Sequence, residues 1–174
     1  MHVLRHDAYN PSDFPLPSSN PQSLPPMTIA ELLRLKPATS ITVLNKPFSY
    51  VGTRALALDG DGELSWLFEE DGNVLAVLAK DEEIIFFEGI DEDLDPQSGM
   101  ILYRGKEFEF SYEDAATVTK ITGDAEGEEG DRYSFSDYEA DDGNVVRLVT
   151  NENTGEVRSY YGVTIVEEDI LPIA

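Results

Sequence analysis

The sequence contains no cysteine, and its 12 lysine and arginine residues stand against 35 aspartate and glutamate residues. Without cysteine, the chain has no disulfides, no thiolate metal sites and no cysteine nucleophile. The formal net charge of −23 repels the phosphates of nucleic acids, so we expect no nucleic-acid partner. Solubility is the simplest explanation for this charge, and the acids also disfavour pairing between exposed sheet edges.

Long apolar runs are missing as well. No stretch approaches the roughly 18 apolar residues that a membrane-spanning helix needs. Residues 1–10 lack the apolar segment of a signal peptide. We therefore expect a cytoplasmic protein that does not insert into a membrane.

Catalytic patterns are equally scarce. The two histidines are His2 and His6, so a histidine-based triad cannot form in the rest of the chain. No glycine-rich phosphate loop follows a strand and opens a helix. Acids are so numerous that no particular pair stands out as a hydrolytic dyad. The sequence predicts a noncatalytic protein without a cofactor.

Residues 1–26 form a proline-rich arm that holds six of the ten prolines. Proline fixes φ and removes a backbone donor, so we expect a flexible arm without helix or strand. Phe14 and Leu16 lie in this arm as apolar anchors of an extended segment, and they are candidate partner-binding residues.

A short helix is predicted over residues 27–37. Thr28 and Glu31 have the spacing of a capping box, and the leucines that follow have helical spacing. Pro37 is expected to end the helix.

From residue 40 onward, apolar residues tend to alternate with a period of two, which is typical of strands. Acidic turns, several of them Asp-Gly pairs that suit tight hairpins, separate the predicted strands of the first half. Those strands cover residues 41–43, 53–58, 63–68, 73–78 and 83–88. The predicted fold is all-β, built mainly of antiparallel meanders in a sandwich or barrel-like body, with one short N-terminal helix.

The second half repeats the pattern of the first. Preserved order among four matches favours a duplication, although Asp-Gly-Asn is common turn chemistry and convergent hairpins remain an alternative. An acidic, glycine-rich insertion at 123–131 explains why the offset between the halves grows. We expect a first β repeat at 38–95 and a second at 96–174, which share one body. The matches are Lys46–Phe48 with Lys106–Phe108, Asp71–Asn73 with Asp142–Asn144, Phe86–Ile90 with Ser159–Val163, and Glu92–Leu94 with Glu168–Ile170.

One acidic segment has some of the spacing of a calcium loop. Asp59, Asp61, Glu63 and Glu70 occupy positions one, three, five and twelve of an EF-hand pattern. Leu64 stands at position six, where an EF-hand needs glycine for its sharp turn. Two interpretations stay open, namely a hairpin turn with solvated acids or a surface calcium site made of these four carboxylates.

A family resemblance is carried by the second half, from Ile101 onward. It rests on residues 132–139, the Asp142–Asn144 turn and the closing segment 161–170. In these features the chain resembles the YjfK-type family of uncharacterised bacterial proteins. The resemblance implies an acidic, cytosolic, β-rich protein, linked by gene neighbourhood to membrane-stress proteins of the phage-shock type, and it carries over no catalytic residue.

The leading hypothesis is a noncatalytic acidic accessory protein that binds another protein, whose identity the sequence does not give. The resemblance places that role in a bacterial membrane-stress system. Two alternatives stay open: a β module that binds divalent cations such as calcium, and a nucleic-acid mimic that inhibits a basic protein.

Overall fold

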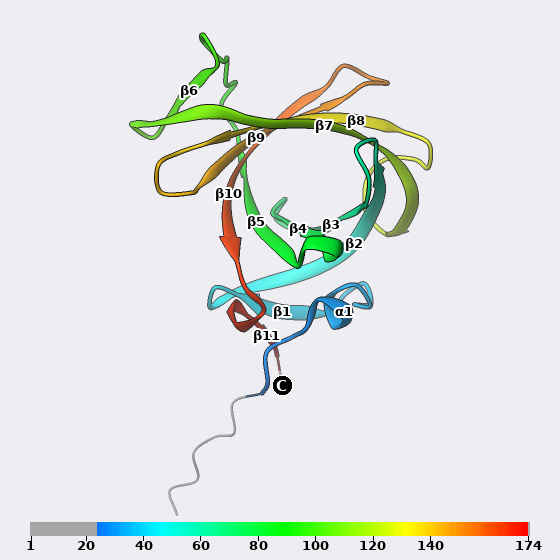
Figure 1. Cartoon of the computed structure of the whole chain (residues 1–174). Helices are drawn as coiled ribbons and strands as arrows, with labels where there is room; N and C mark the ends of the chain where they lie inside the picture. Colours follow the sequence, from blue (N-terminus) through cyan, green and yellow to red (C-terminus); the bar gives the residue numbers. More distant parts are fainter. Residues whose placement is uncertain (1–23, 174) are drawn as a thin grey trace, which may run out of the picture.

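The computed structural model describes residues 24–173, in which two four-stranded meanders close into one barrel (Figure 1). The first half consists of α1 (Ile29–Leu32), β1 (Ser40–Val43), β2 (Lys46–Leu58), β3 (Glu63–Glu69), β4 (Val74–Leu78), a short 3-10 turn at Ala79–Asp81, and β5 (Glu83–Ile90). The second half consists of β6 (Met100–Tyr103), β7 (Lys106–Gly123), β8 (Arg132–Glu139), β9 (Val145–Asn151), β10 (Val157–Ile165), a 3-10 turn at Glu167–Asp169, and β11 (Ile170–Pro172).

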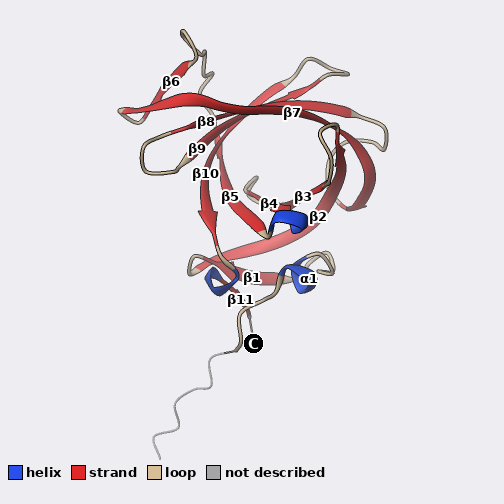
Figure 2. Ribbon diagram, viewed as in Figure 1, coloured by secondary structure: helices blue, strands red, loops and turns tan. Residues whose placement is uncertain are grey.

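The barrel closes through two antiparallel seams. Strands β2 to β5 pair in chain order, and strands β7 to β10 do the same. The pairings β2–β7 and β5–β10 then join the two meanders into a ring of eight strands. Figure 2 shows the ring with α1, β1 and β11 outside it. The prediction of an all-β, barrel-like body made of antiparallel meanders is confirmed.

The two seams have a symmetric register. At the β2–β7 seam, Leu58 pairs with Ala116 and Leu56 pairs with Val118. At the β5–β10 seam, Phe87 pairs with Gly162. Their counterparts in the other half, Tyr160 and Gly89, pair with each other as well. The four sequence matches fall at corresponding places in the two meanders: the start of β2 and β7, the turns before β4 and β9, strands β5 and β10, and the segments after them. The connectivity therefore has an approximate two-fold symmetry, and descent from a duplication stays a prediction.

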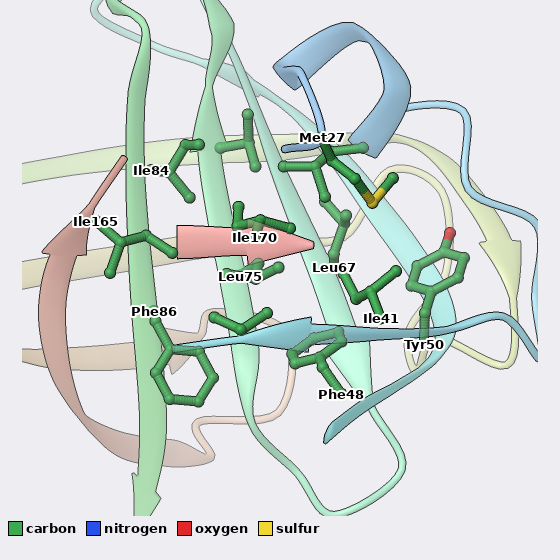
Figure 3. Packing of buried hydrophobic residues seen from close by; sticks show 13 residues of the cluster. Met27, Ile41, Phe48, Tyr50, Leu67, Leu75, Ile84, Phe86, Ile165 and Ile170 are labelled. Carbon is green, nitrogen blue, oxygen red and sulfur yellow. The ribbon is translucent and has the colours of Figure 1, made fainter. Parts of the chain in front are cut away.

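Both faces of the first meander are buried. Leu67, Leu75 and Ile84 point away from the barrel interior into a cluster covered by α1, β1 and β11. Figure 3 shows this packing around Ile170, which comes from the last strand. A smaller cluster that includes Ile101 and Val146 covers the outside of the second meander beneath β6. The segment before each meander thus covers its outer face, and at the first meander the last strand β11 completes the cover.

The helix is shorter than the predicted 27–37. Its capping box is present, because the Glu31 N–H donates to Thr28 Oγ1 and the Thr28 N–H donates to a Glu31 carboxylate oxygen. After Leu32 the N–H groups of Arg34 and Leu35 bond to carbonyls three residues back, which is a tighter geometry than α. So short a helix depends on the packing of its buried side chain rather than on propensity. No helix in residues 24–173 is long and apolar enough to cross a membrane.

Two neighbouring leucines, one at the end of α1 and one at its C-cap, test whether α1 is held by the packing of its buried side chain. Leu32 is 1% exposed and Leu33 is 42% exposed. We expect Leu32→Ala to lower the free energy of unfolding by about 2–5 kcal/mol, because it leaves a cavity in the outer cluster. Leu33→Ala should stay within about 0.5 kcal/mol of the wild type. Denaturant unfolding measures both values, and equal midpoints for the two variants would show that α1 is not part of the cooperative unit.

Candidate functional site

The barrel interior contains two cavities, one toward each end. The larger has a volume of about 600 Å³ and lies toward the loop 124–131. The smaller has a volume of about 440 Å³ and is lined by residues at the opposite ends of the same strands. The larger cavity is lined by Arg54, Trp66, Phe68, Val74, Phe87, Glu126, Gly127, Glu128, Asp131, Tyr133, Arg147, Val149, Asn151, Asn153, Thr154, Glu156, Arg158 and Tyr160.

A buried ion pair separates the two cavities. Arg147 on β9 lies directly across from Asp137 on β8, and its guanidinium donates to both carboxylate oxygens over 2.6 and 2.8 Å. The guanidinium carbon lies 4.7 Å from the ring centroids of Phe87 and Phe135. Arg147 lines both cavities and is only 6% exposed. Its charge is neutralised by Asp137, so the pair acts as a structural partition.

A second arginine points into the larger cavity. Arg54 on β2 is in phase with the buried Leu56 and is 5% exposed. Its guanidinium carbon lies 4.6 Å from the ring centroids of Phe68 and Tyr133, and 5.4 Å from that of Trp66. Aromatic faces attract a cation, most strongly where water is excluded. The three rings therefore hold the Arg54 side chain in place.

Arg54 differs from Arg147 in lacking a carboxylate. Within residues 24–173 it makes no ion pair, and its one hydrogen bond runs from Nη1 to the Tyr133 hydroxyl. Its Nε is buried without an acceptor. Burial lowers the pKa of Arg54, but an arginine keeps its proton in proteins. The cavity thus contains a buried cation that no carboxylate of residues 24–173 contacts, while Glu126 at the rim acts on its charge from a distance.

The Tyr133 hydroxyl is arranged to donate its proton. It accepts hydrogen bonds from Arg54 and, over 3.4 Å, from the Asn151 side-chain amide. No acceptor for its own proton occurs among the described residues. Burial raises the pKa of Tyr133, so the hydroxyl stays protonated at neutral pH. Arg54 and Tyr133 therefore present N–H and O–H donors side by side.

The rim of the larger cavity is acidic and crossed by one basic side chain. Arg158 on β10 binds Glu126 over 3.1 Å and Glu156 over 3.0 Å, and its hydrogen bond to Glu156 raises the pKa of Arg158. Gly127 of the loop 124–131 lies close to Arg54, and its φ is +106°. A Cβ there would lie 3.2 Å from the Tyr133 hydroxyl and 3.5 Å from Arg54 Nη1. Glycine is therefore favoured at this point of the loop.

The four candidate calcium ligands do not come together. Asp59 binds Arg132 over 2.7 Å, and Asp61 binds Lys80 over 2.6 Å. Glu63 begins β3 and Glu70 follows its end, which places them about 20 Å apart at the usual rise per residue. Residues 24–173 contain no group of three or more histidine or acidic side chains suited to a metal ion. Calcium binding by the surface acids stays a prediction, and Phe14 and Leu16 lie outside the described residues.

Sequence reasoning missed both interior arginines. Arg54 and Arg147 each stand in a strand at a position two residues from a buried apolar neighbour. A charged residue in phase with the core is the signal that could have found them. Trp66, which falls in the predicted strand 63–68, is buried at the wall of the larger cavity.

Comparison with known proteins gives one match. A family model described as "Domain of unknown function (DUF4178)" matches residues 39–167. No curated protein and no solved structure gives a significant match. The coarser prediction, that the chain resembles a family of uncharacterised proteins, is confirmed.

The same substitution at the two arginines tests their different roles. Arg147→Met leaves Asp137 buried without a partner and should lower the free energy of unfolding by about 3–5 kcal/mol. Arg54→Met removes a buried charge that has no ion pair within residues 24–173, so we expect the free energy of unfolding to rise or to fall by less than about 1 kcal/mol. Denaturant unfolding compares them, and an equally large loss in both variants would mean that Arg54 is also structural.

Proposed function

The chain belongs to the DUF4178 family, and we propose that it is a noncatalytic binding protein that holds one small, partly aromatic ligand in the larger cavity of its barrel. The observation that carries this proposal is the aromatic-lined cavity of about 600 Å³ at one end of the barrel. Ligand pockets in proteins have volumes of about 300–1,000 Å³, so this cavity suits a single small molecule.

The chemistry of the wall supports an apolar or aromatic body for the ligand. Five aromatic residues line the cavity, and Val74 and Val149 complete its apolar surface. A few polar groups at fixed positions accompany them, which is the usual composition of a small-molecule site. Eight-stranded barrels have room either for a filled core or for one small ligand. The aromatic residues are Trp66, Phe68, Phe87, Tyr133 and Tyr160.

The functions expected from the sequence remain compatible with a ligand in the barrel. An accessory protein that binds a protein partner would gain a ligand-dependent surface at the cavity rim. The narrower YjfK-type assignment, the membrane-stress role and the cytoplasmic location stay predictions, as do calcium binding and nucleic-acid mimicry.

An uncharged dye tests whether the cavity binds ligands. N-phenyl-1-naphthylamine fluoresces more strongly in apolar surroundings, and we expect saturable binding of one dye per chain. Val149→Trp fills the cavity and should weaken binding by at least about tenfold, which corresponds to about 1.4 kcal/mol. Fluorescence titration measures both dissociation constants.

The matched control is Thr150→Trp. Residue 150 follows Val149 on β9 and does not line the cavity, because successive side chains of a strand point to opposite faces. This variant should bind the dye like the wild type. Val74→Phe is a milder filling variant for the case in which Val149→Trp does not fold, and circular dichroism reports folding. Equal binding by folded filling and control variants would contradict the proposal.

A further inference from the structure

Arg54 has a buried charge that no carboxylate of residues 24–173 contacts, and Glu126 acts on this charge only from the cavity rim. Arg54 lies under the loop 124–131 and is 5% exposed, and its guanidinium is surrounded by aromatic rings without an ion pair in residues 24–173. Transferring a charge out of water without a partner is unfavourable by several kcal/mol. The neighbouring Arg147 shows how this fold neutralises such a charge, with a bidentate aspartate. At Arg54 the corresponding anion is missing from the chain itself.

We propose that the ligand of the larger cavity is an amphipathic monoanion, whose oxyanion binds Arg54 and Tyr133 and whose apolar or aromatic body fills the rest of the cavity. This inference rests on the proposed binding function and names the chemical class of its ligand. A carboxylate, a sulfonate and a singly charged phosphate ester share the required chemistry.

The donors at the cavity wall match one oxyanion. Tyr133 accepts two hydrogen bonds and has its own proton left to donate. Arg54 uses Nη1 toward Tyr133, and a guanidinium has five N–H donors in total. Hydrogen bonds between ionised groups are roughly twice as strong as neutral ones. An oxyanion at this place would neutralise the buried cation and accept the proton of Tyr133.

The rim determines the charge that the ligand can have. Glu126, Glu128, Asp131 and Glu156 line the mouth, and Arg158 pairs with two of them. A carboxylate in solvent acts weakly over distance, whereas a charge inside the low-dielectric barrel acts strongly on a group in contact. One negative charge beside Arg54 therefore gains more than it loses at the rim. A polyanion would leave its further charges near four carboxylates, so the rim selects against it.

Two dyes with the same aromatic body provide the test. 1-Anilinonaphthalene-8-sulfonate is N-phenyl-1-naphthylamine with one added sulfonate, so the ratio of their dissociation constants isolates the negative charge. We expect the wild type to bind the sulfonate dye about 10- to 100-fold more tightly, as hydrogen bonds to charged groups imply. Arg54→Met should abolish this preference, Tyr133→Phe should reduce it, and Arg54→Lys should retain part of it.

The control removes a positive charge away from the cavity. Lys106 binds Asp142 on the surface and does not line the cavity. Lys106→Met should leave the preference for the sulfonate dye within about twofold of the wild type, because exposed charges act weakly at a distance. All titrations use the full chain.

The outcomes separate the two proposals. Loss of the preference in Arg54→Met, with the preference intact in Lys106→Met, supports the anion site. If both dyes bind the wild type equally and Val149→Trp weakens both, the cavity binds ligands but the anion inference is wrong. If neither dye binds, or if folded Val149→Trp binds both as the wild type does, the binding function and the anion inference fail together.

Discussion

Closure of the barrel is the constraint on which the rest of the structure depends. The β2–β7 and β5–β10 seams fix the circumference at eight strands, and an eight-stranded ring encloses a space that side chains only just fill. Whether a cavity remains is then decided by a few inward positions. The Phe87 ring can lie against its partner across the β5–β10 seam because that partner is Gly162, where a Cβ would lie 2.5 Å from the ring. Beside that ring, Arg147 and Asp137 divide the interior into two ends.

The two interior arginines show how stability and binding compete in this barrel. Arg147 has a carboxylate, two hydrogen bonds to it and two rings in contact, so its charge is compensated within the chain, although its Nη1 is buried without an acceptor as Arg54 Nε is. Arg54 has rings and one hydroxyl but no carboxylate among the described residues. Sites that bind a ligand often lower the stability of the empty protein. The contrast between two arginines in one core makes Arg54 the residue most readily explained by something outside the chain.

Much of the fold could be predicted because its local signals are strong. The short apolar run at residues 84–87 and the Asp-Gly turns at 59–62 and 71–72 predicted strands and hairpins that the structure contains. The helix over 27–37 was predicted too long, since tertiary packing of Leu32 rather than helix propensity determines where it ends. The cavity could not be predicted in the same way. Arg147 stands between Val146 and Leu148, which pack beneath β6, so both faces of β9 are apolar and alternation does not show which side chains face inward.

The two halves place different chemistry at equivalent positions. Trp66 stands five residues before the Asp-Gly-Asn turn of the first half, and Asp137 stands five residues before that of the second. Phe68 and Glu139 each stand three residues before the same turn of their own half. The first residue of each pair lines the larger cavity, and the second lines the smaller one. These corresponding positions are thus aromatic in the first half and acidic in the second.

The loops that connect the first two strands of each meander differ in length. The β2–β3 turn occupies only residues 59–62, whereas its counterpart between β7 and β8 extends over 124–131 and lines the mouth of the aromatic cavity. The acidic insertion that the sequence comparison located is therefore part of the cavity rim as well as a solvated turn. Its charge contributes to solubility wherever it is exposed, and at this rim the same carboxylates lie beside a buried cation. Selection between ligands by charge requires both, because a cation alone would accept any anion and an acidic rim alone would repel all of them.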